Sequence, residues 1–157
     1  CVTVAGLEDD GSGVTAFTNF MRLLAPAPRG QITAQVGRGE QVFSEVGCAS
    51  CHVPTMMTGP NPIAALANKP VNLFSDLLLH DVGTGDGIEQ GLATGNEFRT
   101  APLWGLSRPD RFMHDGKSKS IEEAILRHGV KAQSAVKGVV GLPQSDYDAL
   151  LAFLDSL

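Results

Sequence analysis

Cys48-Ala49-Ser50-Cys51-His52 is the stretch that decides the fold, because C-x-x-C-H is the attachment sequence of a c-type haem. The thiols of Cys48 and Cys51 can add to the vinyl groups of haem, and His52 then presents an imidazole nitrogen to the iron as proximal ligand. The alternatives are a structural disulfide, a redox pair, which favours a βαβ setting, and half of a zinc site, which needs a second ligand pair. The sequence shows neither that setting nor that second pair, so it predicts one covalent haem c with His52 as a metal ligand.

The residues that precede the motif, 36–47, have a helical pattern. In VGRGEQVFSEVG the apolar residues and a glycine recur at spacings of three and four, as on one face of a helix. This helix is expected to deliver Cys48 at its C-terminal end, where Gly47 can take a positive φ angle. A G-x-x-x-F helix that runs into C-x-x-C-H resembles the opening helix of cytochrome c domains, in which the glycine lets another helix approach closely. Gly39 and Phe43 occupy those positions.

Composition is that of a globular protein with many loops. The 157 residues are 43% hydrophobic and 18% charged, with Gly 18 and Pro 9, which is enough chain to bury a core around a large prosthetic group. We divide the chain into an N-terminal extension with one helix, 1–30, and a cytochrome c-like haem domain, 31–157. The net charge of −5 argues against a nucleic-acid partner, because neutralising phosphates requires a basic surface.

The motif also predicts a location. Haem of this type is attached outside the bacterial cytoplasm, so we expect a periplasmic or otherwise exported protein. No apolar run reaches the length of a membrane span, no signal peptide is visible, and the sequence starts at Cys1. We therefore interpret the chain as a mature or excised fragment. Cys1 is expected to pair with a cysteine upstream of the fragment, to be the lipidated first residue of a lipoprotein, or to be free.

Three further helices make the expected fold class all-α, a cytochrome c-like domain with long loops around one covalent haem. Residues 14–25 are amphipathic, with Met21 assigned to the core, and end at prolines. Ser120 begins a helix with a capping box, and this helix is expected to end at Gly129. The residues that share its inward face are Ile121, Ala124, Ile125 and His128. The last helix, 146–157, has leucines at helical spacing and suits packing across the 36–47 helix.

The segment 97–115, EFRTAPLWGLSRPDRFMHD, mixes aromatic residues with arginines. Arg99 and Trp104 carry donors suited to haem propionates, because guanidinium and indole N–H groups pair with carboxylates in a partly dry pocket. We assign both as cofactor-binding residues, with surface charge for Arg99 and ordinary packing for Trp104 as the alternatives. His80 is interpreted as a hydrogen-bonded buried histidine, with contact to a propionate as the alternative.

Several motifs follow one another along the chain: G-x-x-x-F, C-A-S-C-H-V-P, N-K-P-V-N-L-F-S-D-L-L-L-H-D, E-F-R-T-A-P-L-W-G-L, M-H-D-G-K and I-E-E-A-I-L-R-H-G. In combination they resemble the C-terminal haem domain of the bacterial di-haem oxidoreductase family. That family is sometimes labelled thiol oxidoreductase and is similar to the di-haem cytochrome c peroxidases. The resemblance covers about residues 14–157. One C-x-x-C-H is present, so chemistry that needs a second haem cannot be done by this chain alone.

The resemblance also implies a second axial ligand. In the peroxidase relatives a His-Asp-Gly turn leads into a helix whose inward residue, usually methionine, is the distal ligand of the electron-transfer haem. Here the turn begins at His114, which is expected to hold it through hydrogen bonds, and His128 stands at the place of the methionine. We assign His128 as the distal metal ligand, with Met113 as the second choice and an open five-coordinate iron as the alternative.

Two classes of function remain open. The first is single-electron transfer through a closed, six-coordinate haem, with a redox partner protein or a second haem domain as partner. The alternative is the catalytic haem of a peroxidase-like di-haem oxidoreductase, with an open distal site and an acid/base residue such as His114 or Glu122 that assists O–O cleavage. Four histidines in the chain and a methionine near the expected distal side favour the closed site.

Overall fold

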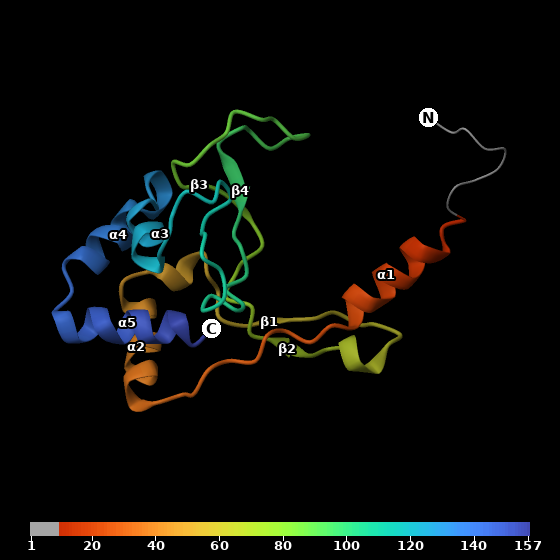
Figure 1. Ribbon diagram of the computed structural model, residues 1–157, viewed down its shortest axis with the longest axis horizontal. Coiled ribbons are helices and arrows are strands. Elements are labelled where there is room, and N and C mark those ends of the chain that lie inside the picture. Colours follow the sequence, from red (N-terminus) through yellow and green to blue (C-terminus); the bar gives the residue numbers. More distant parts are fainter. Residues whose placement is uncertain (1–9) are drawn as a thin grey trace.

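The computed structural model describes residues 10–157, so Cys1 lies outside the described residues. These residues are mostly helical, with two small antiparallel sheets (Figure 1). The helices are α1 (Ser12–Leu23), α2 (Ala34–Glu45), α3 (Ile121–Leu126), α4 (Gln133–Val140) and α5 (Gln144–Asp155). Short 3-10 turns occur at Cys48–Ser50, Ala64–Leu66 and Val130–Ala132. The strands are β1 (Met56–Met57), β2 (Pro70–Val71), β3 (Leu79–Asp81) and β4 (Glu97–Arg99).

The sheets are the difference from the expected all-α fold. β1 pairs with β2 and β3 pairs with β4, both antiparallel, with Met56 opposite Val71 and His80 opposite Phe98. The loops that these strands flank are rich in glycine and proline, which do not favour helices. Pairing of short stretches satisfies part of the backbone N–H and C=O groups of such loops. The helical prediction is therefore confirmed for the core, while the long loops around it carry the strands.

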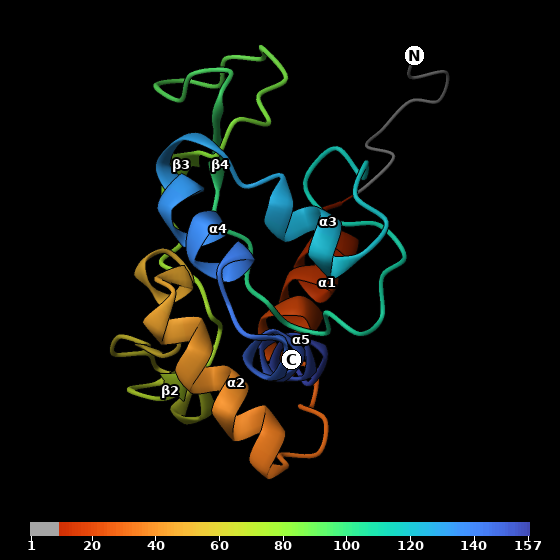
Figure 2. The same ribbon diagram turned by 90° about the vertical axis from the view of Figure 1, so that its left-hand side faces the viewer.

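The core forms where α2 and α5 cross (Figure 2). Gly39 lies so close to α5 that a Cβ atom built on it would be 1.9 Å from the carbonyl oxygen of Ala149. The helices reach this separation because glycine has no side chain at the crossing. The predicted crossing of the helix before the motif and the last helix is confirmed, although both helices begin and end two residues earlier than predicted.

Aromatic side chains fill the space beside this crossing. Phe43 from α2 is 2% exposed and Phe153 from α5 is fully buried, with 5.2 Å between their ring centroids. Phe74, from the loop between β2 and β3, packs edge-on against both rings. Buried aromatic rings in such contacts contribute strongly to stability. The loop that carries Phe74 is thereby fixed to the helical core.

Both ends of α2 are encoded in the sequence. The Thr33 side chain accepts a hydrogen bond from the Val36 N–H, 3.3 Å, and caps the N-terminal end. After the helix, Gly47 has a φ angle of 91°, a left-handed conformation that glycine adopts without strain. This is the positive φ angle that the sequence predicts, and the chain passes from it directly into the Cys48–Ser50 turn.

α1 stands away from the helical body in Figure 1. It has no buried residue, and the side chain of Met21 is 52% exposed, so the assignment of Met21 to the core is wrong. No other helix among residues 10–157 makes an extensive contact with α1, and the chain that follows it, 24–33, has no helix or strand. An amphipathic pattern predicts a helix with an apolar face but not the surface on which that face packs.

The C-terminal region departs from the prediction in two places. α3 is shorter than expected, so His128 lies two residues beyond its end instead of in its last turn. The reason is that the Gly129 N–H donates to the Val82 carbonyl oxygen, 2.8 Å, and Val130 takes a φ angle of 45°, which together lead the chain out of the helix. α4 is not predicted, since its glycine and valines give a weak helical signal. Within the described part of the chain, no helix combines the length and apolarity needed to cross a membrane.

Candidate functional site

The C-x-x-C-H motif forms a hydrogen-bonded turn after α2. The His52 N–H donates to the Cys48 carbonyl oxygen, 3.0 Å, and the Ser50 hydroxyl donates to the Gly47 carbonyl oxygen, 2.6 Å. Cys48 and Cys51 are half-buried, and both are free thiols. The turn thus keeps two thiols and an imidazole on one short stretch of chain.

The thiol of Cys48 is not suited to redox or nucleophilic chemistry. Burial raises its pKa to about 11, whereas a reactive cysteine needs a lowered pKa, because the thiolate is the reactive form. Cys48 also follows the C-terminal end of α2, where carbonyl dipoles disfavour a negative charge. These surroundings argue against a thioredoxin-like pair and are compatible with covalent attachment of a prosthetic group.

His52 is oriented by a hydrogen bond from its ring to the backbone. Nδ1 lies 2.9 Å from the carbonyl oxygen of Phe74, so Nδ1 carries the proton and Nε2 keeps its lone pair. Burial lowers the pKa of His52, while the hydrogen bond to Phe74 acts in the opposite direction. The ring is therefore neutral at physiological pH. Proteins commonly present Nε2 of a histidine to a metal with the Nδ1–H bound in this way.

The loop that provides this carbonyl has a strained backbone. Phe74 has a φ angle of 51°, which is uncommon for a bulky residue. The next residue, Ser75, is fully buried. Its N–H donates to the Val53 carbonyl oxygen, 2.9 Å, and its hydroxyl donates to the Thr100 carbonyl oxygen, 2.7 Å. The surroundings thus maintain the conformation that aims the Phe74 carbonyl at His52.

His128 lies near His52, in the segment after α3. Its Nδ1 is 2.7 Å from the carbonyl oxygen of Ala124, which leaves its Nε2 available as well. The centroids of the His52 and His128 rings are 6.4 Å apart, and their planes make an angle of 61°. The structure therefore brings together the two histidines that the sequence identifies as candidate ligands.

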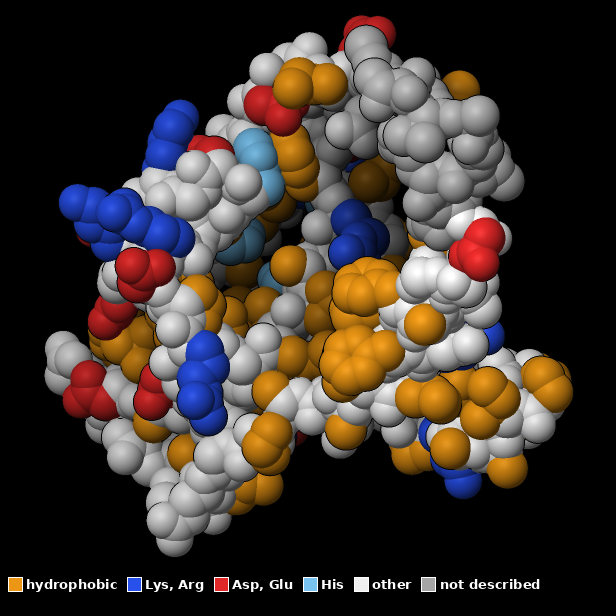
Figure 3. Space-filling view, turned by 45° about the vertical axis from the view of Figure 1, so that its right-hand side comes forward, with side chains coloured by type: hydrophobic (Ala, Val, Ile, Leu, Met, Phe, Trp, Pro, Cys, Tyr) orange, Lys and Arg blue, Asp and Glu red, His pale blue; other side chains and the backbone are white. Residues whose placement is uncertain are grey.

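These residues fit a haem. An imidazole nitrogen binds a metal at about 2 Å, so two rings on opposite sides of one metal have centroids about 6 Å apart. The observed separation of 6.4 Å agrees with this value. Figure 3 shows a deep hollow with histidine side chains on its wall and hydrophobic side chains around it. Two free thiols, two imidazoles and an apolar surface are the donor set and the surroundings that a c-type haem needs.

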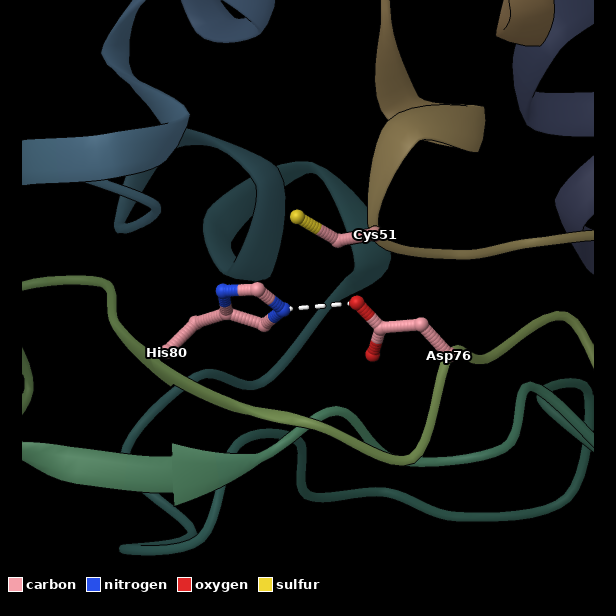
Figure 4. Close-up of side chains that lie close together, drawn as sticks. All are labelled: Cys51, Asp76 and His80. Carbon is pink, nitrogen blue, oxygen red and sulfur yellow. Dashed lines mark hydrogen bonds and ion pairs between the residues drawn. The ribbon is translucent and has the colours of Figure 1, made fainter.

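Asp76 and His80 form a second polar group beside the motif (Figure 4). His80 Nε2 lies 2.7 Å from Asp76 Oδ2, and ligand atoms of both side chains lie within 4.8 Å of Cys51 Sγ. Burial raises the pKa of Asp76, but hydrogen bonds from His80 and from the Leu78 N–H outweigh it and lower the pKa below its ordinary value. His80 is thus hydrogen-bonded and part-buried, as predicted. The sequence prediction missed Asp76, for which the D-x-x-x-H spacing is the available signal.

The same three side chains could serve a different ligand. Cys51, Asp76 and His80 offer a thiolate, a carboxylate and an imidazole, which are ligand types that zinc accepts. A thioether bond to haem removes the thiolate of Cys51 from this set. Haem attachment and metal binding by these three residues therefore exclude one another.

The other predicted cofactor-binding residues are more exposed. Arg99 is an exposed residue at the end of β4. Trp104 is 41% exposed, and its indole N–H donates to the Asn72 carbonyl oxygen, 2.8 Å. The assignment of both residues to haem propionates stays a prediction. The indole N–H of Trp104, which would have to donate to a propionate, already donates to the Asn72 carbonyl oxygen.

Met113 and His114 belong to the His-Asp-Gly turn. Met113 is half-buried with a φ angle of 65°, and its carbonyl oxygen accepts a hydrogen bond from the Gly116 N–H, 3.2 Å. The His114 ring stacks on Phe98, with 3.6 Å between centroids, and its Nε2 bonds to the Thr84 carbonyl oxygen. His114 therefore holds the turn through hydrogen bonding, as predicted.

An ion pair joins this turn to the end of α3. Asp115 accepts hydrogen bonds from both terminal nitrogens of Arg127, at 3.0 and 2.6 Å. Arg127 also donates to the hydroxyl of the fully buried Ser118, 3.0 Å. These hydrogen bonds fix the position of Arg127, the residue directly before His128. The sequence signal for this pair is an acidic residue before α3 and a basic residue directly after it, and such charges do not specify the pairing.

The chain matches the sequence model of a protein family over residues 12–157, and the family is described as "Di-haem oxidoreductase, putative peroxidase". No curated protein and no solved structure matches the chain. The matched range begins at the first residue of α1 and includes the C-x-x-C-H turn and both histidines of the site.

Proposed function

The chain belongs to the di-haem oxidoreductase family, and from this premise we propose that it is a c-type haem domain that transfers single electrons. Membership of the family supports a haem-associated redox function. The proposal is more specific: one haem c, bound covalently through Cys48 and Cys51, with His52 and His128 as axial ligands in a six-coordinate, cytochrome c-like site.

One observation carries this proposal, the 6.4 Å separation of the His52 and His128 rings. It is the separation expected for two axial ligands of one iron. If both imidazoles bound the iron, no position would remain open for peroxide, and the haem would serve single-electron transfer. Two imidazoles also favour the ferric state relative to a His/Met pair, so we expect a reduction potential below that of methionine-ligated relatives.

The chain's own residues have separate roles in this function. Cys48 and Cys51 fix the porphyrin to the end of α2, and the Phe74 carbonyl orients His52 by accepting the Nδ1–H bond, 2.9 Å. The buried ring of Phe43, 6.3 Å from the His52 ring, excludes water from this side of the site, which influences the potential by lowering the local dielectric. When bound, the haem supplies an iron that alternates between the ferric and ferrous states.

We also propose the setting of this function. Attachment of haem c requires export from the bacterial cytoplasm, so the protein is expected to act in the periplasm or beyond it. A redox partner protein or a second haem domain then donates or accepts the electron. The sequence contains one C-x-x-C-H, which supports a count of one haem for this chain.

The mass and the visible spectrum of the protein, produced with a haem-maturation system, test the proposal. The denatured chain is expected to carry the mass of one haem. The ferric protein is expected to be low-spin and to keep its spectrum when azide or cyanide is added. A bare polypeptide mass would overturn the covalent attachment, and a high-spin spectrum that changes with azide would overturn the closed site.

A catalytic haem is the second candidate, and the Asp76–His80 pair is the observation that favours it. The two side chains are 12% and 20% exposed and share a 2.7 Å hydrogen bond, so together they can take up and deliver a proton, as cleavage of a peroxide O–O bond requires. His114 is a weaker acid/base candidate, because its ring is stacked on Phe98 and bound to a carbonyl. Peroxide turnover that is lost in Asp76→Asn but kept in His114→Gln would support this candidate over electron transfer.

A further inference from the structure

Arg127, the residue before His128, makes a two-point contact with the His-Asp-Gly turn. Its terminal nitrogens donate to the two carboxylate oxygens of Asp115, at 3.0 and 2.6 Å. One of these nitrogens also donates to the hydroxyl of the fully buried Ser118, 3.0 Å. A planar guanidinium bound at two oxygens has a fixed distance and a fixed orientation. The contact therefore fixes the direction in which the chain enters His128.

The turn that receives Arg127 is closed by its own hydrogen bonds. The Phe112 N–H donates to the Ser118 carbonyl oxygen, 2.9 Å, and so joins the two ends of the turn. The Lys117 N–H donates to the Asp115 carboxylate, 3.1 Å, and the side chain of Asp115 is 16% exposed. The carboxylate that holds the arginine is therefore itself held in place.

The residue after His128 is held from the other side. The Gly129 N–H donates to the Val82 carbonyl oxygen, 2.8 Å. Two residues further along that segment, the Thr84 carbonyl oxygen bonds to the ring of His114, which belongs to the same turn. The chain on both sides of His128 is thus tied to the His-Asp-Gly turn, directly on one side and through one short segment on the other.

Packing of α3 supplies only part of this constraint. The helix is six residues long and has no buried residue. Ile121 and Ile125 are partly buried against the core, and Leu126 at its end is 60% exposed. A helix of this length is not stable through its own hydrogen bonds. The polar contacts of Arg127 therefore contribute strongly to the position of His128.

We propose that Arg127 is a positioning residue that keeps His128 on the haem iron, through its ion pair with Asp115. The inference rests on the proposed function, because it requires His128 as an axial ligand. A histidine that leaves the iron for long must move its backbone. A fixed backbone returns the ring before another ligand binds, and it avoids the entropy cost of ordering the segment at each return. The ion pair thus determines how closed the distal site is.

The binding of carbon monoxide to the ferrous, haem-loaded protein tests the proposal. Carbon monoxide takes the position that His128 vacates, so its binding rate at a fixed concentration reports how often and how long the histidine is away. Arg127→Gln removes the charge and the two-point contact. It is expected to raise this rate at least about tenfold, because hydrogen bonds between charged groups are among the stronger ones.

Asp115→Asn measures the same ion pair from its other partner. It is expected to raise the rate by a factor similar to that of Arg127→Gln. The double variant should bind carbon monoxide no faster than either single variant, because each substitution already removes the same interaction. Additive effects of the two substitutions would contradict a role of the pair as one unit.

Two controls separate this role from a general loss of stability. Arg38 forms a comparable two-point ion pair with Asp146, at 3.0 and 2.7 Å, but this pair joins α2 to α5. Arg38→Gln is expected to lower the unfolding temperature and to leave the carbon monoxide rate unchanged. His128→Ala is expected to bind carbon monoxide fast, and adding Arg127→Gln to it should not change that rate, because no distal histidine remains to be held.

Three further results would overturn the proposal in a parent protein that is low-spin before carbon monoxide is added. An unchanged rate in Arg127→Gln would show that other contacts hold His128. An equal increase in Arg38→Gln would assign the effect to lost stability. A further increase when Arg127→Gln is added to His128→Ala would show that the arginine controls access to the pocket. A high-spin ferrous parent is a distinguishable result, because it would overturn the proposed function and this inference with it.

Discussion

The imidazole rings of His52 and His128 lie 6.4 Å apart, although one follows α2 and the other follows α3. In each ring Nδ1 is within 2.9 Å of a backbone carbonyl oxygen, that of Phe74 for His52 and that of Ala124 for His128. The two Nε2 atoms are therefore the nitrogens that remain available for a metal. This relationship supports the proposal that the two rings are axial ligands of one haem iron.

Replacement of His128 is the direct test of this pair. In His128→Ala the haem is expected to stay attached through Cys48 and Cys51, but the ferric protein should lose its low-spin visible spectrum and bind added imidazole, because one axial position is open. Met113→Ala is the matched control and should keep the low-spin spectrum of the parent. The reverse outcome, a change in Met113→Ala and none in His128→Ala, would transfer the distal role to Met113.

Replacement of two glycines of α2 by alanine is expected to change the free energy of unfolding in opposite directions. A Cβ atom on Gly39 would lie 1.9 Å from the Ala149 carbonyl oxygen, whereas a Cβ atom on Gly37 would meet nothing within 4 Å. Gly39→Ala is therefore expected to lower the free energy of unfolding by about 3 kcal/mol or more, the upper end of overpacking effects, because backbone has to move. Gly37→Ala should raise it by about 0.5–1 kcal/mol. Urea unfolding measures both, and equal values would show that α2 and α5 do not meet at Gly39.

The buried ring of Phe43 provides a test of the core. Phe43 is 2% exposed and contacts the ring of Phe153, so Phe43→Ala is expected to lower the free energy of unfolding by about 3–5 kcal/mol. Phe17 is 63% exposed on α1, and in the isolated chain Phe17→Ala should change this free energy by less than about 0.5 kcal/mol. A loss at Phe43 no larger than that at Phe17 would contradict the packing of α2 on α5.

The parts of the fold that the sequence predicts are those with local signals. The C-x-x-C-H spacing identifies the turn that we propose as the haem attachment site, and the apolar periodicity before it identifies α2. Gly47 and Gly39 are predictable because a left-handed turn and a close helix crossing each require glycine. His128 could be selected as a candidate ligand because of its family position and the apolar pattern before it, although α3 ends two residues earlier than His128.

Two kinds of feature are not predicted from the sequence. The first depends on backbone groups, which every residue has, and the second depends on packing between segments that are far apart in the sequence. The carbonyls of Phe74 and Ala124 orient the two imidazoles, but every residue has a carbonyl. The left-handed φ angle of Phe74, 51°, is imposed by its surroundings against its own preference. The exposure of α1 depends on which surface receives it, and an amphipathic pattern does not contain that information.

The ion pair of Asp115 and Arg127 leads to a prediction about pH. Hydrogen bonds from the Arg127 guanidinium hold the pKa of Asp115 well below its ordinary value of 3.8. The unfolded chain, in which the carboxyl has its ordinary pKa, therefore takes up a proton at a higher pH than the folded chain does. The pair stabilises the fold at pH values above about 4, and this contribution is lost as the pH falls from about 4 towards the lower folded pKa.

Asp115→Asn removes this contribution and keeps the size of the side chain. At pH 7 the variant is expected to unfold at a lower temperature than the parent, by about 2–4 °C for each kcal/mol that the pair contributes. The difference should shrink as the pH is lowered from about 4 to about 2, because the parent then loses the same interaction. Asp110→Asn, an exposed position in the preceding loop, is the control and should follow the parent throughout. Thermal unfolding followed by circular dichroism over this pH series measures the effect. If the difference in unfolding temperature between Asp115→Asn and the parent stayed constant down to about pH 2, the carboxylate charge would not be what stabilises the turn.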